Sequence, residues 1–178
     1  MKRILTVQDI SCVGKCSLTV ALPVISASGV ECSVLPTAVL STHTAFPEFT
    51  FRDLTDEIEP IGEVFSRLGI DFDAVYTGYL GSKRQVALVS ELIRRQKERG
   101  AYILIDPVMA DNGSLYPGYT AEFPPLKAEM SLMADLDVPN VTEAALMLDM
   151  PYREKYDEKY FKVISPSELE SETYLIDM

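Results

Sequence analysis

The stretch that decides the fold is "SKRQVALVSELIRRQKERGAYILID", residues 82–106, where a helical pattern passes directly into the pattern of a buried strand. Ser82 and Gln85 have the spacing of a capping box, basic residues crowd the last turns, and Gly100 follows them. The apolar side chains that would face a core recur at helical spacing: Val86, Val89, Leu92 and Ile93. We therefore predict a helix that Gly100 stops and a strand over "AYILID" (101–106).

Strands and helices also alternate on either side of this stretch. "RILTVQD" (3–9), "ECSVLPTAVL" (31–40) and "DFDAVYTG" (71–78) are predicted strands, and "GKCSLTVALPVISASG" (14–29) favours a helix that Pro23 would kink. Further along, a short strand is expected near 134–138. Strands that alternate with helices indicate an α/β fold with a parallel sheet.

The helix after that short strand is expected to begin in "NVTEAALMLDM" (140–150), where Asn140 and Glu143 have capping-box spacing. Asp137 lies within the short strand, which is an awkward place for a charge unless the strand is at an edge or the acid is paired.

The composition suits one globular domain with a sizeable core, because 47% of the 178 residues are hydrophobic. The net charge of -11 and the pI near 4.5 argue against nonspecific binding to nucleic acid or to an anionic membrane. The apolar run of the opening "MKRILTVQDIS" ends too early, at Gln8, for a signal peptide or a membrane span. The expected location is the cytoplasm.

Two simple motif interpretations fail. Cys12, Cys16 and Cys32 with a single histidine do not have zinc-site spacing, and the first two cysteines are too far apart for a C-x-x-C motif, so reduced thiols are expected. "VGKCS" is not a phosphate-binding P-loop, because Asp9 stands where that motif needs its first glycine and Cys16 stands where it needs Ser or Thr.

The strongest candidate site follows the strand at 101–106, in "DPVMADNGSLY" (106–116). Asp106 stands where the buried strand stops, and Asp111 precedes the tight turn Asn112-Gly113. Open α/β sheets bind ligands at the carboxyl ends of their strands, and carboxylates bind Mg²⁺ directly or through its waters. These acids could equally be ordinary turn residues, and Glu143 could be only a helix cap.

Two further segments carry candidate binding residues. His43 lies in "STHTAFPEF" (41–49) beside several hydroxyl groups, which favours a small polar ligand, although a lone histidine is more often a structural hydrogen-bonder. "TGYLGS" (77–82) places glycines on both sides of Tyr79 between a strand and a helix, where backbone amides could approach a ligand. Tyr79 could also be an aromatic side chain at the edge of the core.

Four blocks together resemble one known family, with matching order and spacing from residue 1 to about 152. They are "TVQDISCVGKCSLTVALPVISASGVECSVLPTAVLSTHTAF", "VYTGYLGS", "DPVMADNGSLY" and "VPNVTEA". They resemble the pyridoxal or pyridoxamine kinases, the vitamin B6 kinases of the ribokinase superfamily. The resemblance implies an α/β fold of the ribokinase-like, parallel-sheet sandwich type.

The resemblance also implies roles for individual residues. Ser11, His43, Thr44 and Tyr79 resemble substrate-binding residues of the vitamin pocket. Asp106 and Asp111 resemble the acids that orient Mg²⁺ and the ATP phosphates, and Asn140 and Glu143 resemble the nucleotide and metal end of the site. By this resemblance, ATP is the co-substrate, Mg²⁺ is the cofactor, and Asp106 and Glu143 are the expected metal ligands. A homodimer is a further expectation.

One family element has no counterpart in this sequence. These kinases carry a late G-[ST]-G-D segment whose amides form an anion hole and whose aspartate is the catalytic base, and no glycine occurs here after residue 152. We therefore predict no catalytic base in this chain. Residues 1–152 are interpreted as the N-terminal part of a kinase domain whose sheet is incomplete at its C-terminal end. Residues 153–178 are interpreted as a divergent charged tail, from truncation, a frameshift or simple exposure.

Four functional hypotheses remain open. The first is phosphorylation of the 5'-hydroxymethyl group of pyridoxal, pyridoxine or pyridoxamine in vitamin B6 salvage, with this chain inactive if the base is truly absent. The second is a non-catalytic pyridoxal-binding or interaction domain. The third is a hydroxymethylpyrimidine kinase of the same superfamily. The fourth is a fragment that does not fold stably, because a sheet that stops early exposes an apolar edge.

Overall fold

Helix α3 (Lys83–Glu98) and strand β5 (Tyr102–Ile105) form where the sequence predicted them. The four residues of the apolar stripe are buried, and Ser82 Oγ accepts the Gln85 backbone N–H at 3.1 Å. The second half of the predicted capping box is wrong, because the Gln85 side chain does not accept a hydrogen bond from the Ser82 backbone N–H. Its Oε1 instead accepts the Gly81 N–H at 2.7 Å. The helix therefore has its cap, and Gln85 is released for a different task.

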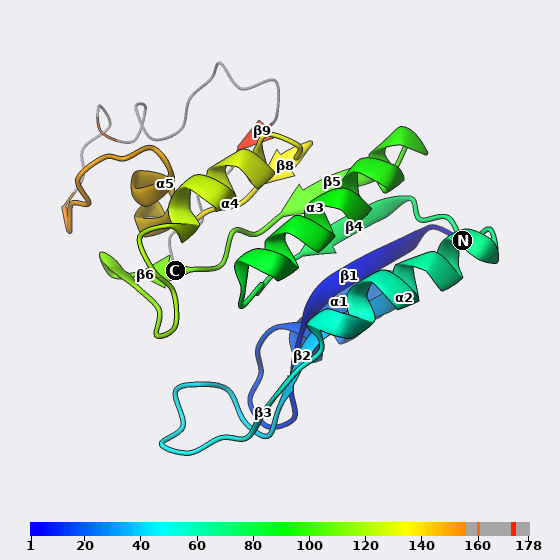
Figure 1. Ribbon diagram of the computed structural model, residues 1–178, viewed down its shortest axis with the longest axis horizontal. Coiled ribbons are helices and arrows are strands. Elements are labelled where there is room, and N and C mark those ends of the chain that lie inside the picture. Colours follow the sequence, from blue (N-terminus) through cyan, green and yellow to red (C-terminus); the bar gives the residue numbers. More distant parts are fainter. Residues whose placement is uncertain (156–159, 161–171, 174–178) are drawn as a thin grey trace. The chain divides into compact units, whose positions relative to one another are not determined.

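The computed structural model (Figure 1) describes residues 1–155, 160 and 172–173. These residues fall into a first unit, Met1–Ile103, and a second unit, Leu104–Met178, with the division inside β5. The structure is an α/β fold with a mostly parallel sheet: β1 pairs in parallel with β2 and β4, and β8 with β5 and β9, whereas β2 and β3 pair antiparallel.

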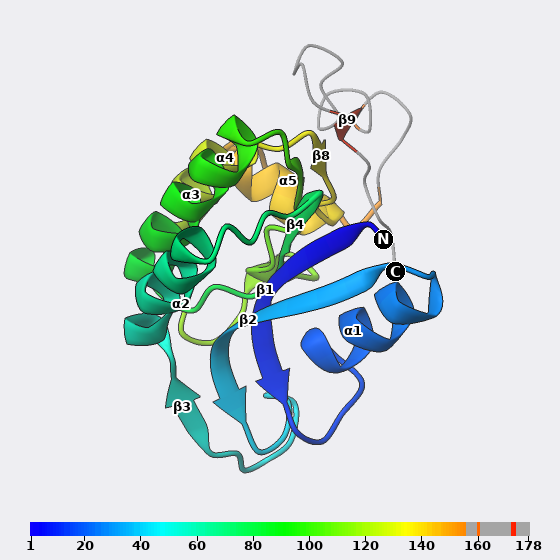
Figure 2. The ribbon, with the colours of Figure 1, turned by 90° about the vertical axis from the view of Figure 1, so that its right-hand side faces the viewer.

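The first unit contains the strand order β3-β2-β1-β4-β5. Helix α1 covers one face of these strands, and α2 and α3 lie on the other face (Figure 2). Its remaining elements, in chain order, are β1 (Arg3–Ser11), α1 (Leu18–Ala27), β2 (Glu31–Leu40), β3 (Phe51–Asp53), α2 (Thr55–Arg67) and β4 (Ala74–Thr77).

The core of the first unit explains why its strands were easy to predict. Leu5, Val7, Leu35 and Val75 are completely buried between the two helical layers. Strands that are covered on both faces read as nearly continuous apolar runs, which is how β1 and β2 appear in the sequence. The observed β2 has the predicted bounds, whereas β1 continues past its predicted end to Ser11.

Two helices of the structure, α2 and α4, were not predicted from the sequence, and prolines explain both cases. Helix α2 contains Pro60 in its second turn, and α4 (Phe123–Ser131) begins with Pro124 and Pro125. Proline lacks a backbone N–H, so the first turn is the part of a helix where it is tolerated. Pro124 and Pro125 therefore fit the first turn of α4, whereas Pro60 lies further inside α2, and in both helices proline obscured the helical pattern in the sequence.

The second unit contains the strand order β5-β8-β9 and a small hairpin. Beyond α4 its elements are the hairpin strands β6 (Ala110–Asp111) and β7 (Ser114–Leu115), β8 (Leu136–Asp137), α5 (Val141–Met147) and β9 (Glu172–Thr173). The predicted tight turn is confirmed, since Asn112 and Gly113 both have positive φ, 50° and 77°. That combination matches the two-residue hairpin turn expected for Asn-Gly.

Most of the predicted tail, 153–178, lies outside the described residues. Within it the structure describes β9, which pairs in parallel with β8, so these two residues contribute backbone to the sheet. The sequence analysis had not anticipated this strand. Within the described part of the chain, no helix has the length and apolar character needed to cross a membrane.

Candidate functional site

The carboxyl end of β1 holds a buried pair of polar residues. Ser11 and Asp9 are 1% and 5% exposed, and the Ser11 hydroxyl donates a hydrogen bond to Asp9 Oδ2 at 3.2 Å. The register between β1 and β2 shifts beside Asp9, since Gln8 pairs with Pro36 whereas Ile10 pairs with Val39. Such a bulge redirects side chains at the end of a strand. The predicted residue Ser11 is therefore fixed inside the first unit by an acid that the sequence analysis did not select.

The hydroxyl group of Tyr79 lies close enough to Asp9 for the charge of the carboxylate to affect its pKa. Burial raises the pKa of the Tyr79 hydroxyl, and the negative charges of Asp9 and Asp53 raise that pKa further. The Tyr79 side chain folds over Gly81, where an added Cβ would lie 2.8 Å from the phenol oxygen. The structure thus brings Tyr79 and the Asp9–Ser11 pair into one polar region of the first unit.

Gln85 holds the backbone of this region. It is buried, and besides accepting the Gly81 N–H it donates to the Thr37 carbonyl and to Thr55 Oγ1, both at 3.0 Å. Thr37 Oγ1 in turn donates to the Tyr79 carbonyl at 3.2 Å. The side chain that the capping box does not use therefore joins β2, α2 and the loop at 79–81.

His43 and Thr44 lie in the loop after β2. Thr44 is exposed, and within the described part of the chain no hydrogen bond holds its side chain, whereas the His43 ring lies half-buried against Phe46 at 4.7 Å between ring centres. The same loop borders an open depression lined by Ser41, Pro47, Glu48, Phe49 and Thr50. His43 therefore has a defined position in the first unit, and Thr44 is less constrained.

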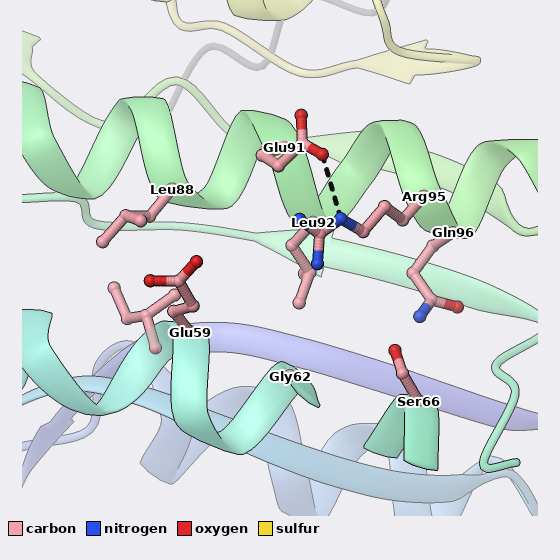
Figure 3. A pocket seen from close by; sticks show the side chains of 9 residues that line it. Glu59, Gly62, Ser66, Leu88, Glu91, Leu92, Arg95 and Gln96 are labelled. Atoms are coloured by element: carbon pink, nitrogen blue, oxygen red, sulfur yellow. Dashed lines mark hydrogen bonds and ion pairs between the residues drawn. The ribbon is translucent and has the colours of Figure 1, made fainter. Parts of the chain in front are cut away.

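A separate groove of the first unit lies between α2 and α3 (Figure 3). Its volume of about 40 Å³ has room for only a few water molecules. Glu91 accepts a hydrogen bond from Arg95 at 2.9 Å along its rim. None of the predicted site residues lines it, so this groove is not the candidate site.

Asp106 is the electrostatic centre of the second unit. Burial raises the pKa of its carboxyl group to about 7, and the neighbouring charge of Glu143 raises it as well. The Lys127 ammonium group and a hydrogen bond from the Val108 backbone act in the opposite direction. A carboxyl group poised near neutral pH at the end of a strand is typical of a functional site, although structural charge networks produce the same shift.

Glu143 is predicted both as a ligand and as a cap, and the cap is confirmed. Asn140 Oδ1 accepts the Glu143 backbone N–H at 2.9 Å, while Glu143 Oε2 accepts the Asn140 N–H at 3.0 Å. Glu143 Oε1 accepts the Met109 N–H at 2.9 Å, and Asn140 Nδ2 donates to the Ala110 carbonyl at 2.8 Å. The two predicted residues therefore tie the start of α5 to the loop that follows Asp106.

Lys127 provides a buried positive charge in the same unit. It is the largest completely buried side chain of the described residues. Burial lowers its pKa to about 8, while Asp106, Glu143 and Asp137 all act to raise it. Asp137 has a pKa raised to about 7, mainly by burial, and accepts a hydrogen bond from Ser131 Oγ at 3.1 Å. The awkward acid of the short strand is therefore buried and paired, as the sequence required.

Asp111 does not share the environment of Asp106. It is exposed on the hairpin, and its carboxylate accepts hydrogen bonds from the Asn112 backbone and side chain at 2.7 and 3.0 Å. The charges of both aspartates meet at Tyr116, whose pKa is raised first by burial and then by Asp111, Glu143 and Asp106. The acid that accompanies Asp106 in the buried cluster is therefore Glu143.

The side chains of the second unit fit a supporting role toward a divalent cation better than a complete shell. Among the residues that the structure describes, no group of three or more His, Cys, Asp or Glu side chains is placed to hold a metal ion. Both oxygens of Glu143 already accept backbone N–H groups. Asp106 has the freer carboxylate, so it is the residue of this unit that fits a Mg²⁺ ion or one of its waters.

The sequence analysis missed four polar residues that shape these regions: Asp9, Gln85, Tyr116 and Lys127. Asp9 had a usable signal, since an acid inside the apolar strand "ILTVQDIS" needs a partner. Lys127 had none, because its helix was not recognised and a lysine is rarely fully buried.

Comparison with known proteins gives a consistent picture. No family model matches the chain. A Schizosaccharomyces pombe protein provisionally named as a pyridoxal kinase is 31% identical over 84% of this chain and 49% of its own length. A pyridoxal kinase of Histophilus somni is 32% identical over 80% of this chain and 52% of its own length. The chain thus spans about half the length of the curated relatives it matches.

Solved structures agree with these relatives. A pyridoxal kinase from Lactobacillus plantarum is 29% identical, with a TM-score of 0.91 over 100% of this chain and 64% of that protein. A Bacteroides thetaiotaomicron protein, provisionally described as a phosphomethylpyrimidine kinase and crystallised with pyridoxal, is 41% identical with a TM-score of 0.88, over 92% of this chain and 57% of its own.

A third structure, a Leishmania donovani pyridoxal kinase with ADP and pyridoxamine, is 25% identical with a TM-score of 0.82, over 92% of this chain and 59% of that one. Sequence and fold point in the same direction in all of these comparisons. Over the residues compared, this chain belongs to the pyridoxal kinase family and has its ribokinase-like fold.

Proposed function

We propose that the first unit binds the ring of a pyridoxal-type vitamin, whose 5'-hydroxymethyl group is the phosphoryl acceptor in this family. The observation that carries this proposal is the buried Asp9–Ser11 pair beside Tyr79, in a chain 41% identical to a protein crystallised with pyridoxal. A buried hydroxyl and carboxylate can hydrogen-bond a polar aromatic ring, and Tyr79 supplies an aromatic wall. Ser11, His43, Thr44 and Tyr79 are the proposed substrate residues.

We propose that the second unit serves the nucleotide. Mg²⁺ bound to ATP would neutralise charge on the phosphoryl group during transfer. Asp106 is the proposed residue for that cation, directly or through water, and Asp111 is the proposed residue for the nucleotide phosphates. Asn140 and Glu143 hold the loop after Asp106 in place, so their proposed role is to position it. The ADP in the Leishmania relative supports a nucleotide co-substrate.

No G-[ST]-G-D segment occurs in the 178 residues, so no residue here is assigned as the catalytic base. We therefore propose that this 178-residue chain binds the vitamin without turning it over. The resemblance also supports a cytoplasmic homodimer, which sedimentation analysis would test directly.

The experiment that tests this function is calorimetric titration of the folded 178-residue chain with pyridoxal, followed by a phosphorylation assay with Mg-ATP. We expect heat of binding and no pyridoxal phosphate. Ser11→Ala should weaken binding by about tenfold, because it leaves the buried Asp9 without its hydroxyl donor. Ser26→Ala, at an exposed serine of α1, is the matched control and should bind as the wild type does.

Three outcomes would change the proposal. A folded sample that gives no heat with pyridoxal would refute vitamin binding. Equal affinities of the wild type and Ser11→Ala would remove Ser11 from the site. Pyridoxal phosphate above background would show that the chain supplies a base that its sequence does not reveal.

A second candidate function is phosphorylation of hydroxymethylpyrimidine. It is favoured by the provisional description of the Bacteroides protein as a phosphomethylpyrimidine kinase. Titration of one sample with pyridoxal and with hydroxymethylpyrimidine separates the two functions, since the true substrate should bind at least about tenfold more tightly. Tighter binding of the pyrimidine would overturn our first choice, and binding of pyridoxal alone would leave only its catalytic fate to settle.

A further inference from the structure

The loop after β1 is joined to the loop after β2 by backbone hydrogen bonds. The Cys12 N–H donates to the Leu40 carbonyl at 2.9 Å, and the Val13 N–H donates to the Ser41 carbonyl at 3.2 Å. The His43 N–H then donates back to the Val13 carbonyl at 3.2 Å. The backbone of His43 is therefore fixed next to Val13 and Gly14, within the first unit.

Gly14 leaves the space that the imidazole ring of His43 occupies. A Cβ added to Gly14 would lie 2.2 Å from His43 Cδ2 and 3.2 Å from both Cγ and Nε2. Gly14 also has a φ of +111°, which L side chains rarely adopt. Two independent reasons thus require glycine here, and one of them is the ring itself.

The other contacts of the ring decide which nitrogen carries its proton. His43 Nδ1 accepts the Ala45 backbone N–H at 3.2 Å, and Phe46 packs against the ring edge. In a neutral imidazole one nitrogen accepts and the other donates, so the hydrogen is on Nε2. Among the residues that the structure describes, none accepts a hydrogen bond from this Nε2–H. The ring therefore presents a donor whose orientation is set in advance.

We propose that Gly14 is a positioning residue that acts through His43. Because it has no side chain, the imidazole lies against the loop after β1 with Nε2–H available to a ligand that offers a hydrogen-bond acceptor, such as the oxygen of a hydroxyl group on its ring. This inference rests on the vitamin-binding function proposed above. Gly14 belongs to "VGKCS", which is not a P-loop. Its role in ligand recognition comes instead from the space that it leaves for His43.

The first test needs no ligand, because His43 is the only histidine of the chain. Its ring nitrogens give the only imidazole signals in a ¹⁵N spectrum of the labelled full chain. We expect the wild type to show the Nε2–H tautomer, and Gly14→Ala to shift both signals because the methyl group displaces the ring. Wild-type signals in Gly14→Ala would overturn the proposal.

Gly29→Ala is the matched control for backbone strain. Gly29 also has a positive φ, +78°, but an added Cβ meets nothing within 4 Å. It should therefore share the cost of the backbone conformation and leave the His43 signals as they are. Equal perturbation by the two variants would show that strain alone moves the ring, and would overturn the proposal.

The second test measures coupling to the ligand by calorimetry with pyridoxal. Gly14→Ala should weaken binding roughly tenfold, and the same change in a His43→Ala background should cost almost nothing more, because neighbours that act together are not additive. An equal loss in both backgrounds would show that Gly14 acts through the loop backbone and would overturn the role of His43.

The two tests separate this inference from the proposed function. If the wild type does not bind pyridoxal, vitamin binding fails, while the spectrum still shows whether Gly14 places the ring. If pyridoxal binds and Gly14→Ala displaces the ring without changing affinity, the function stands and the inference falls.

Discussion

The polar region around Tyr79 and the one around Asp106 are built on different physical principles. In the first unit, neutral side chains such as Gln85 and Thr37 hold loops by direct hydrogen bonds at about 3 Å. In the second unit, Asp106, Asp137 and Lys127 are buried charges whose pKa values move toward neutrality.

Because of this difference, we expect substitutions in the two regions to change stability in different ways. A hydrogen-bonded network loses stability only where a partner is removed, because the cost is the desolvation of the group left behind. A buried charge cluster responds as a whole, because three carboxylates share one ammonium group in a region of low dielectric. We therefore expect local effects in the first unit and collective effects in the second.

The largest expected effect is that of Lys127→Met. It removes the positive charge that lowers the pKa of both Asp106 and Asp137, so we expect a loss of about 3–5 kcal/mol in the free energy of unfolding. Urea denaturation measures the loss, and hydrogen exchange should show it in residues 104–155 before β1 and β2. Lys97→Met, at an exposed lysine of α3, should change stability by less than about 0.5 kcal/mol.

Adding Asp137→Leu to Lys127→Met sharpens this prediction. The double variant removes one acid together with the ammonium group, so it should recover part of the lost stability. A Lys127→Met protein as stable as the wild type, or a double variant less stable than the single one, would contradict the idea of a shared charge.

The second effect is the dependence of stability on pH. Asp106 and Asp137 have pKa values raised from 3.8 to about 7, so between these values the folded protein holds protons that the unfolded chain has released. The free energy of unfolding therefore falls as pH rises through that window. Lys127 has a pKa lowered from 10.5 to about 8, so stability rises again as pH rises through that higher window.

A stability minimum between about pH 7 and about pH 8 follows from these signs. Urea midpoints from about pH 4 to about pH 10, which cover both windows, measure it, with an expected depth on the order of 1 to 3 kcal/mol. Asp137→Asn should flatten the acid side of the curve. A stability maximum in this interval would show that the carboxyl groups titrate in their ordinary range.

The third effect concerns the first unit and is smaller and local. Gln85→Leu leaves the Gly81 N–H without its partner and removes one of the two donors to the Thr37 carbonyl, which keeps the Leu54 N–H, so we expect a loss of about 2–3 kcal/mol. Gln96→Leu is a matched control on the same helix, because Gln96 is equally buried and its Oε1 has no hydrogen-bond partner among the described residues (Figure 3). It should cost much less, and equal losses would mean that packing dominates both sites.

The smallest expected effect is that of Asn140→Ala. It removes a helix cap and the bond to the Ala110 carbonyl, so we expect a loss of about 1 kcal/mol, seen as a lower Tm. Hydrogen exchange at Met109 and Ala110 should rise, since the loop after Asp106 loses an anchor. If those amides keep their protection, Glu143 alone holds the loop.

The ease of prediction also differs between the two regions. Ser11 lies at the end of β1 and Tyr79 lies just past β4, two strands that the sequence pattern predicted, whereas the roles of these residues come from the family resemblance. The joint role of Asp106 and Asp111 comes from the family resemblance and stays a prediction. In the structure Glu143 acts on the pKa of Asp106, while Asn112 hydrogen-bonds the exposed Asp111.

The sequence by itself determined the alternation of strands and helices, the caps at Ser82 and Asn140, the Asn-Gly turn and the family. Periodicity and capping are local, so they depend on residues only a few positions apart. The tertiary structure decided that Lys127 is buried among carboxylates, that Gln85 joins three elements and that Gly14 makes room for His43. These contacts link residues distant in sequence, and burial, which sets their strength, exists only once the chain has folded.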